Sequence, residues 1–551
     1  MPDFYTDAIF ATRGKRLCSA NADPALGTYV EGDEMTDGQY LLGIDLGTGG
    51  ARAGIFDVRG YPKAASSTEW ETRFPRTGRA EQNPQDWWDG AVRAVRQAVA
   101  DSGLAPEQIA GISLDSTSST VVAMDNNGEH LRPAIMWMDV RAADQAEQVR
   151  QTGAAALKYA GSGPVSAEWG LPKAMWLREN EKETWDSAAV VTDCTDWMVK
   201  KLTGEWTMSL NHAAGKYFHD NSVGGWPEEL YNKLGGEEIL AKYPQRVLPI
   251  GEVVGGLTAA AAEAMGLKEG TPVAEGAIDA HAGAIGLGVV APGTMALITG
   301  SSHVIIAQSD VPLHAEGIWG AYTDALVKGQ YTVEAGQAST GSIVAWYKNQ
   351  FAKEAGARAA EQGVDPYDIL NEMATDIPIG SDGLVFMDYF QGNRTPHSDP
   401  HVRGAVHGLG LGHTEAHIYR SILEGVAYGT EDILRVMRAN GFSPQTTVVS
   451  GGAAHSEVWM QIHADVANMP MQFTEVQEGP TLGSAMLAAI GAGIYPDLQS
   501  AAENMVHVTD VLEPNPEAVE AYRFYTDRYL ETYPALKEVM HKVTAHENAK
   551  E

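Results

Sequence analysis

The stretch YLLGIDLGTGGARAGIFD, residues 40–57, combines two strand patterns with a glycine-rich turn between them. It begins with an apolar run, and after the turn small or apolar residues alternate with others. This pattern predicts a strand, a tight turn and a second strand. Glycines in such a turn let backbone N–H groups approach phosphate oxygens closely. We interpret it as a candidate phosphate loop, although an ordinary hairpin explains the motif taken alone equally well.

Two charged residues flank this turn in positions that suit nucleotide chemistry. Asp45 stands at the end of the first predicted strand, where a carboxylate can hold water on a Mg²⁺ ion. Arg52 stands in the second strand, and its guanidinium can contact a phosphate. Asp45 is therefore a candidate metal residue and Arg52 a candidate catalytic residue.

The rest of the chain predicts an α/β fold. Residues 293–308, GTMALITGSSHVIIAQ, repeat the pattern of strand, small-residue turn and strand. Helix patterns alternate with strand patterns along the chain. A helix is predicted at residues 84–100, with Asn83 as its N-cap. A buried strand is predicted next, within GISLDSTSSTVVAMD at residues 111–125. A chain of 551 residues is too long for one core, so two lobes are expected. The predicted divisions are a disordered tail or misassigned start at 1–38, a first lobe at 39–289 and a second lobe at 290–545, with helices at about 516–542.

Bulk properties exclude several classes of function. The formal net charge of −33 disfavours binding to nucleic acid or to an anionic membrane. No apolar run is long enough to span a bilayer, and no secretory signal pattern opens the chain. Two cysteines, Cys18 and Cys194, provide neither a disulfide framework nor a cysteine-based metal site. A cytoplasmic protein fits these features.

A single carboxylate, Asp279, lies within EGAIDAHAG, residues 275–283. The small residues after it allow Asp279 to lie at the mouth of a cleft where ligands pack closely. A carboxylate in that place suits the role of general base toward a substrate hydroxyl. The same residue also suits the start of a helix, and the two interpretations are compatible.

Two further turns suit a nucleotide. The turn Thr299-Gly300-Ser301-Ser302 resembles the first turn in its chemistry, and a simple hairpin is the alternative. The segment VVSGGAAHS, residues 448–456, places two glycines between a strand and a helix, where an adenosine can lie against the backbone. Close strand–helix packing also explains those glycines. The order of the four motifs is therefore more informative than any one of them.

That order, and much of residues 40–535, resembles the FGGY family of carbohydrate kinases. The most specific match is RGAVHGLGLGH at residues 403–413, continuing to RSILEG at 420–425, which resembles the family's C-terminal signature. The resemblance implies a two-lobed α/β fold of the actin-like, ribonuclease-H-like ATPase type, with ATP, Mg²⁺ and a small-molecule sugar meeting between the lobes. It also allows a homodimer. It implies a catalytic base at Asp279, a Mg²⁺-organising carboxylate at Asp45, phosphate contacts at Thr48, Gly49, Arg52, Gly300 and Ser301, and nucleotide contacts at Gly341, Gly451, Gly452 and Ser456.

Within the family the sequence looks most like the ribulokinases. Glu334, in EAGQ, and Lys216, in AAGKYFHD, match sugar-contacting positions there, and Ser118 lies in the segment that lines the same pocket. The form IDAH at 278–281 disfavours glycerol and xylulose kinases. The resemblance therefore implies phosphorylation of a terminal hydroxyl of a ribulose-type ketopentose, with xylulose, a branched ketose or erythritol as alternatives.

Two segments depart from the L-ribulokinase form and leave the stereochemistry of the sugar open. They are GNRTPHSDP at residues 392–400, which is closer to kinases of D-ribulose and less defined pentuloses, and WMDVR at 137–141. Two other classes also remain as alternatives. One is an actin-like ATPase coupled to movement or chaperoning, and the other is a non-catalytic sugar-binding regulator.

Overall fold

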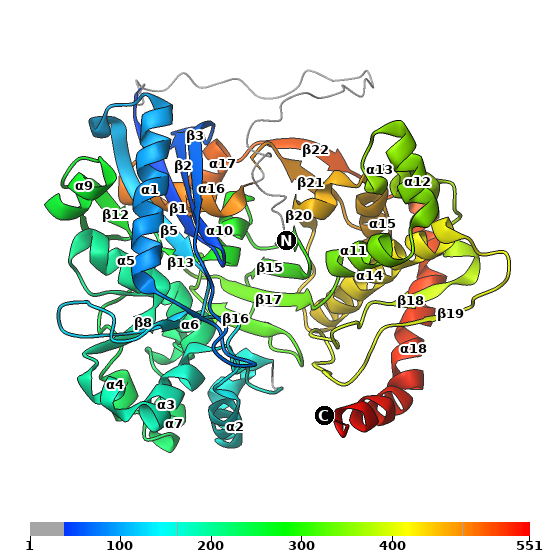
Figure 1. The fold of residues 1–551 in the computed structure, drawn as a ribbon, viewed down its shortest axis with the longest axis horizontal. Coiled ribbons are helices and arrows are strands. Elements are labelled where there is room, and N and C mark those ends of the chain that lie inside the picture. Colours follow the sequence, from blue (N-terminus) through cyan, green and yellow to red (C-terminus); the bar gives the residue numbers. More distant parts are fainter. Residues whose placement is uncertain (1–37, 162, 477, 551) are drawn as a thin grey trace.

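The computed structural model describes residues 38–161, 163–476 and 478–550, so the predicted tail lies almost entirely outside the described residues. Two seven-stranded sheets form the centres of two lobes (Figure 1). The first sheet has the order β11-β12-β5-β1-β2-β3, with β13 paired to β5. Its strands are β1 (Tyr40–Leu46), β2 (Gly50–Asp57), β3 (Pro62–Glu69), β5 (Ile109–Ser116), β11 (Val253–Gly256), β12 (Pro272–Ala274) and β13 (Ala277–Ile278).

The second sheet repeats the opening of the first. Its order is β16-β17-β15-β14-β20-β21-β22, and the antiparallel pair β14–β15 is the strand–turn–strand unit predicted at residues 293–308. As in the first lobe, the opening strand also pairs in parallel with a later strand, here β20. Its strands are β14 (Thr294–Thr299), β15 (His303–Ser309), β16 (Trp319–Thr323), β17 (Tyr331–Gln337), β20 (Thr446–Gly451), β21 (Met471–Thr474) and β22 (Val508–Leu512).

Helices cover both sheets, and the predicted helix after Asn83 is confirmed. Helix α1 spans Pro84–Ser102, and the Asn83 side chain accepts a hydrogen bond from the Gln85 backbone N–H, which satisfies one free donor of the first turn. The other helices numbered before β14 are α2 (Ala143–Gln151), α3 (Gly170–Asn180), α4 (Lys182–Ser187), α5 (Cys194–Thr203), α6 (Leu210–Tyr217), α7 (Glu228–Lys233), α8 (Glu237–Leu240), α9 (Ala259–Met265) and α10 (Asp279–Gly286).

The second half of the chain contains longer helices. The closing segment is one helix, α18 (Pro516–Asn548), which begins at the predicted residue and extends beyond the predicted end. No helix in the described part of the chain has the length and apolarity needed to cross a bilayer. The remaining helices are α11 (Gly341–Gln350), α12 (Lys353–Gln362), α13 (Pro366–Thr375), α14 (Glu415–Ala439), α15 (Glu457–Ala467), α16 (Gly479–Gly491) and α17 (Leu498–Met505).

The single strand predicted within residues 111–125 is wrong, because the chain forms two strands there. Strand β5 ends at Ser116, and the next strand begins at Val121 in a different, four-stranded sheet. An apolar pattern does not report a change of sheet, since both strands are buried. Residues 117–120 therefore connect the two sheets. The four-stranded sheet contains β4 (Glu81–Gln82), β7 (Ala134–Ile135), β6 (Val121–Met124) and β8 (Val190–Asp193), and short pairs join β9 (Met208–Ser209) to β10 (Val247–Leu248) and β18 (Val385–Met387) to β19 (Ala405–His407).

Helices α16 and α17 belong to the second half of the sequence but pack in the first lobe, where Figure 1 shows them in orange among the blue strands. Helix α16 contacts β1, β5 and α10. The fit is tight: a Cβ at Gly43 would lie 2.0 Å from the Thr481 carbonyl oxygen, and one at Gly483 would lie 1.9 Å from the Ala282 carbonyl oxygen. The lobe boundary near residue 289 therefore stays a prediction.

The family-like signature at residues 420–425 serves the packing of α14. Glu424 is fully buried and accepts hydrogen bonds from the Gly380 N–H at 3.0 Å and the Ser381 hydroxyl at 2.9 Å. Arg420 donates to the same carboxylate at 2.9 Å. A Cβ at Gly425 would lie 2.3 Å from the Phe386 carbonyl oxygen, so glycine is required there. These residues join α14 to the loop before β18.

We expect Glu424→Gln to lower the free energy of unfolding by about 3–5 kcal/mol, because it leaves the buried Arg420 without its charged partner. Thermal unfolding followed by circular dichroism measures the change. Glu372→Gln is the control, since the Arg358–Glu372 pair is exposed and contributes about 0–1 kcal/mol. Equal shifts in the two variants would contradict this account of the signature.

Candidate active site

A cavity of about 520 Å³ lies between the two lobes. Its walls come from the ends of β1, β5 and β13 on one side and from β14, β15 and β17 on the other. Eight of the predicted site residues line it: Asp45, Thr48, Gly49, Arg52, Ser118, Lys216, Asp279 and Glu334.

Strand register explains why residues far apart in sequence meet here. Strands β1 and β13 both pair in parallel with β5, so their carboxyl ends reach the same edge of the sheet. Asp45 lies opposite Asp115, and Ile278, directly before Asp279, lies opposite Ser116. Three carboxyl groups are therefore gathered at one edge of the sheet.

The first turn is held from two sides. The Gln82 side chain donates to the Thr48 carbonyl oxygen at 2.7 Å, and the Trp137 indole N–H donates to the Thr48 hydroxyl at 3.0 Å. Arg52 donates to the Asp45 carboxylate at 2.5 Å, and the charge of Asp45 raises the pKa of Arg52. The Arg52 side chain is 40% exposed, so it remains accessible from the cavity.

Asp279 is the first residue of α10, and its half-buried side chain lines the cavity. Burial and the charge of Asp45 raise its pKa to about 7, against the opposing effects of the Ala280 N–H at 2.7 Å and of His212 and Lys216. A carboxylate with a pKa near neutrality is well matched to accept a proton at physiological pH.

Asp115 is the third carboxyl group at this edge. It is fully buried, accepts a hydrogen bond from the Ser484 hydroxyl of α16 at 2.6 Å, and its Oδ1 has no partner among the described residues. Burial and the charge of Asp45 raise its pKa well above the usual range. A cation beside Asp45 would offset this concentration of negative charge.

The residues present fit a Mg²⁺ ion that shares its ligands with a nucleotide. No group of three or more His, Cys, Asp or Glu side chains in the described ranges could hold a metal ion alone. Mg²⁺ usually takes one or two carboxylates and completes its shell with phosphate oxygens and water. Asp45 at the cavity wall meets that requirement.

Lys216 and Glu334 form an ion pair across the cavity. Lys216 comes from α6 and Glu334 from β17 of the second sheet, and their Nζ and Oε2 atoms are 2.9 Å apart. Burial acts to raise the pKa of Glu334, but the charges of Lys216 and His281 outweigh it and lower that pKa. Lys216 is not an ordinary surface lysine, since its side chain is only 7% exposed.

Aromatic side chains surround this ion pair. The Lys216 Nζ lies 5.0 Å from the ring centroid of Trp319 and 5.8 Å from that of Trp169. The Arg394 guanidinium lies 5.7 Å from the same Trp319 ring. Indole faces beside polar groups are suited to the C–H surfaces and hydroxyls of a sugar.

Sequence reasoning assigned no role to four aromatic or charged side chains that line the cavity. Trp137 and Arg394 lie in the two segments, 137–141 and 392–400, that were noted only because they differ from the L-ribulokinase sequence. Glu168 and Trp319 lie outside every motif, so no local signal identifies them. The cavity wall also includes Trp137, Glu168, Trp319 and Arg394 together with Thr117 and Ser302.

The predicted nucleotide residues Gly300, Ser301, Gly341, Gly451 and Gly452 gather at the carboxyl ends of β14 and β20, next to the cavity. The N–H groups of Thr340 and Ser342 donate to the Ser301 carbonyl oxygen at 2.9 and 3.1 Å. These bonds join the second turn to the start of α11. Ser456 differs, because its hydroxyl caps α15 and donates to the Asn371 side chain at 3.0 Å.

The glycines near the turns separate into two groups. A Cβ at Gly341 would lie 2.3 Å from the Gly300 carbonyl oxygen, and one at Gly451 would lie 1.9 Å from the Thr299 carbonyl oxygen, so protein packing alone requires these two. A Cβ at Gly49 or Gly452 would meet no atom of the described residues within 4 Å. Open space beside Gly49 and Gly452 leaves room for a ligand.

We expect Gly452→Ala to raise the KM for ATP by roughly tenfold, or about 1.4 kcal/mol, since its methyl group would occupy the open space that we predict the nucleotide fills. Steady-state kinetics with varied ATP measures it, and thermal unfolding should be unchanged. Gly412→Ala in an exposed loop is the control, because a Cβ there also meets nothing within 4 Å in the described structure. Identical KM values in both variants would contradict the assignment.

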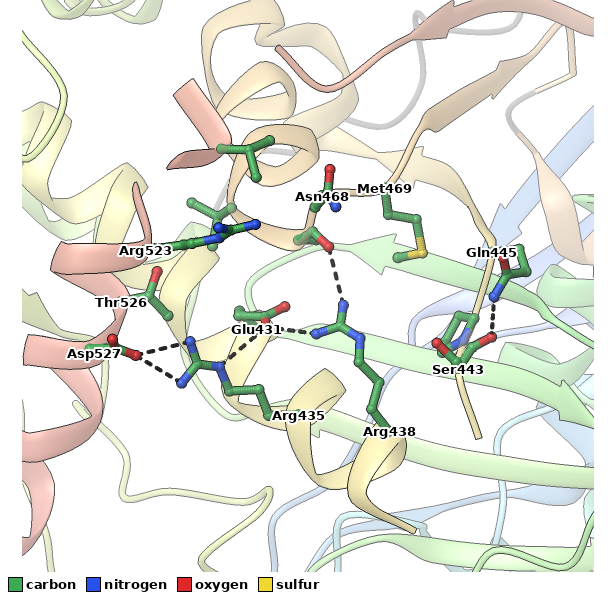
Figure 2. A pocket seen from close by; sticks show the side chains of 14 residues that line it. Glu431, Arg435, Arg438, Ser443, Gln445, Asn468, Met469, Arg523, Thr526 and Asp527 are labelled. Atoms are coloured by element: carbon green, nitrogen blue, oxygen red, sulfur yellow. Dashed lines mark hydrogen bonds and ion pairs between the residues drawn. The ribbon is translucent and has the colours of Figure 1, made fainter. Parts of the chain in front are cut away.

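A second cavity, of about 440 Å³, lies in the second lobe beside α14 and α18 (Figure 2). Arg435 and Arg438 both bind the Glu431 carboxylate, and Arg435 also binds Asp527. Its charged groups are thus largely neutralised by one another. None of the predicted site residues lines it.

Comparison with known proteins places the chain in a family. Residues 40–286 match the N-terminal domain of the FGGY family of carbohydrate kinases, and residues 295–492 match its C-terminal domain. The chain belongs to the FGGY family of carbohydrate kinases. It is therefore an ATP-dependent sugar kinase, a phosphotransferase with an alcohol group as acceptor. The alternatives of an ATPase without a sugar acceptor and of a non-catalytic regulator are not supported.

Relatives of this FGGY kinase have different names at similar identity. A Xenopus laevis protein named FGGY carbohydrate kinase domain-containing protein is 31% identical, covering 92% of this chain and 96% of the relative. A ribulokinase from Shouchella clausii is 30% identical over 89% and 94%. The crystal structure of xylulose kinase from Rhodospirillum rubrum superposes with a TM-score of 0.80 at 28% identity, covering 91% of this chain and 100% of that one. The two-lobed actin-like fold is confirmed, and the predicted resemblance to ribulokinases in particular is not resolved.

Proposed function

We propose that this FGGY kinase transfers the γ-phosphoryl group of ATP to a terminal hydroxyl of a ribulose-type ketopentose. The Lys216–Glu334 pair carries the proposal, because it places a charged donor and a charged acceptor together in the cavity. A ketose presents a carbonyl and several hydroxyls, which need convergent donors and acceptors. Ser118 adds a hydroxyl to the same cavity.

In this proposal Asp279 accepts the proton of the attacking hydroxyl. Its pKa near 7 and its place at the cavity wall support that role. Thr48, Gly49, Arg52, Gly300 and Ser301 bind the phosphates, and Gly341, Gly451 and Gly452 form the surface for the rest of the nucleotide. For Ser456 the proposal is weaker, since its hydroxyl already caps a helix.

Asp45 is proposed to hold a Mg²⁺ ion through its carboxylate. Such an ion neutralises charge on phosphate oxygens during phosphoryl transfer. Arg52 shares this task and keeps Asp45 in position through its 2.5 Å contact. Closure of the two lobes around the cavity would exclude water and protect ATP from hydrolysis.

An ADP-release assay across ketopentoses, tetritols and glycerol tests the proposal. We expect the highest kcat/KM with one stereoisomer of ribulose. A higher value with xylulose, a branched ketose or erythritol would replace the proposed acceptor but retain the kinase activity. ATP turnover that does not depend on any acceptor would overturn the proposed sites as well.

A further inference from the structure

Lys173 is a lysine in the first turn of α3 whose side chain is completely buried. Its Nζ donates three hydrogen bonds, all to backbone carbonyl oxygens: Ser119 at 2.8 Å, Met136 at 2.6 Å and Trp137 at 3.1 Å. An ammonium group has three N–H donors, so each one has an acceptor. No salt-bridge partner of Lys173 is found in the described part of the chain.

The three carbonyls belong to two segments that form the wall of the active-site cavity. Ser118, directly before Ser119, lines the cavity, and so does Trp137. The contact continues to the first phosphate turn, because the Trp137 indole N–H donates to the Thr48 hydroxyl at 3.0 Å. One buried ammonium is therefore joined to the sugar-facing segment directly and to the phosphate turn through Trp137.

This arrangement is costly for stability, so a packing role alone does not explain it. Burial lowers the pKa of Lys173 to about 7, and the charge of Arg141 acts in the same direction. The charges of Glu168, Asp139 and Asp193 act in the opposite direction but do not outweigh burial. An apolar side chain of similar length would fill the same space without this desolvation cost. It would not hold three carbonyl oxygens from two separate segments in one place.

We propose that Lys173 is a positioning residue for the kinase reaction: its three N–H bonds hold the Ser118 segment in the arrangement that binds the sugar, and hold the Trp137 segment that supports the Thr48 phosphate turn. The proposal rests on the sugar-kinase activity of the family and not on which ketopentose is the acceptor. Lys173 itself lies behind the cavity wall and does not line the cavity.

The ammonium form has one donor for each carbonyl, whereas the neutral amine has only two. When Lys173 loses its proton above neutral pH, one of the three carbonyl oxygens loses its donor. The Ser118 and Trp137 segments of the cavity wall are then held less firmly. The affinity for the sugar should fall as pH rises. Asp279 titrates in the same range, but its deprotonation acts in the opposite direction and on turnover. The KM for the sugar and kcat therefore report the two groups separately.

Lys173→Met tests the proposal, because methionine keeps the length of the side chain and removes the donors. We expect the KM for the best acceptor to rise by about tenfold or more at pH 6.5, with kcat changed by less than about threefold. The KM of the wild type should rise between about pH 6.5 and 8.5, and that of the variant should be flat. Lys182→Met, on the surface of α4, is the control and should behave like the wild type.

The outcomes are distinguishable. A lower melting temperature with an unchanged KM, or the same pH slope of KM in the wild type and the variant, would overturn the positioning role. If Lys173→Met does not fold, calorimetric titration of the wild type with the sugar, without nucleotide, decides the matter: weaker binding above about pH 7 supports the proposal and constant affinity overturns it. A failed ketopentose assignment changes only the acceptor used in these measurements.

Discussion

Asp279→Asn is expected to lower kcat by about 10²–10⁴-fold with little change in the KM for ATP, because the variant cannot accept the proton of the attacking hydroxyl. The wild-type kcat should rise with pH as Asp279 loses its proton near pH 7, and this rise should be absent from the variant. Single-turnover and steady-state assays between about pH 5.5 and 8.5 measure both effects.

The stability of Asp279→Asn separates a catalytic role from a structural one. Because burial raises the pKa of Asp279, the folded state disfavours its ionised carboxylate. The free energy of unfolding therefore falls as pH rises from the pKa of this residue in the unfolded chain toward about 7. A neutral asparagine removes that cost, and the variant should be at least as stable as the wild type at neutral pH. Asp101→Asn on the exposed face of α1 is the control. Near-normal kcat in Asp279→Asn would refute the assignment of the base.

Lys216→Met should lower kcat/KM for the sugar by about 30–150-fold, roughly 2–3 kcal/mol, because Glu334 would lose its charged partner and the sugar would lose a donor. The effect should appear mainly in the KM for the sugar, while the KM for ATP stays within about twofold. Initial rates with each substrate varied in turn provide these values.

A double-mutant cycle with Glu334→Gln completes this prediction. Because the two side chains are in direct contact at 2.9 Å, the double variant should lose less than the sum of the single losses. Lys233→Met, from the exposed Lys233–Glu229 pair on α7, should leave both KM values unchanged. Additive losses in the cycle would show that Lys216 and Glu334 act independently.

The sequence identifies the residues whose role depends on local backbone structure. The turn between Asp45 and Arg52 follows from an apolar strand and adjacent glycines, and Asp279 follows from a carboxylate at the start of a helix of small residues. Lys216 and Glu334 are found through family resemblance alone, because nothing in their local sequence indicates that α6 and β17 meet.

Residues that reach the cavity only through tertiary packing were missed for the same reason. Trp319 of β16 and Glu168, in the turn before α3, meet in the cavity wall although they are far apart in sequence, and no sequence period predicts that they do. Lys173 stands among apolar residues in GLPKAMWL. Its three carbonyl acceptors come from distant segments, so the local sequence does not indicate that this lysine is buried and hydrogen-bonded. The break after Ser116 was missed because the strands on both sides of it are buried, so the sequence shows no change of exposure between them.

Helix α16 has a consequence for how this protein could have arisen and how it could be divided. Close contacts at Gly43 of β1 and at Gly483 of α16 join this helix to β1 and α10, so the elements that carry Asp45 and Asp279 are covered by residues almost two hundred positions after the proposed boundary. A fragment that stops at that boundary would leave this surface bare. The two halves of the chain are therefore not interchangeable modules, and a chimaera that exchanges one half must keep a matching contact surface for α16.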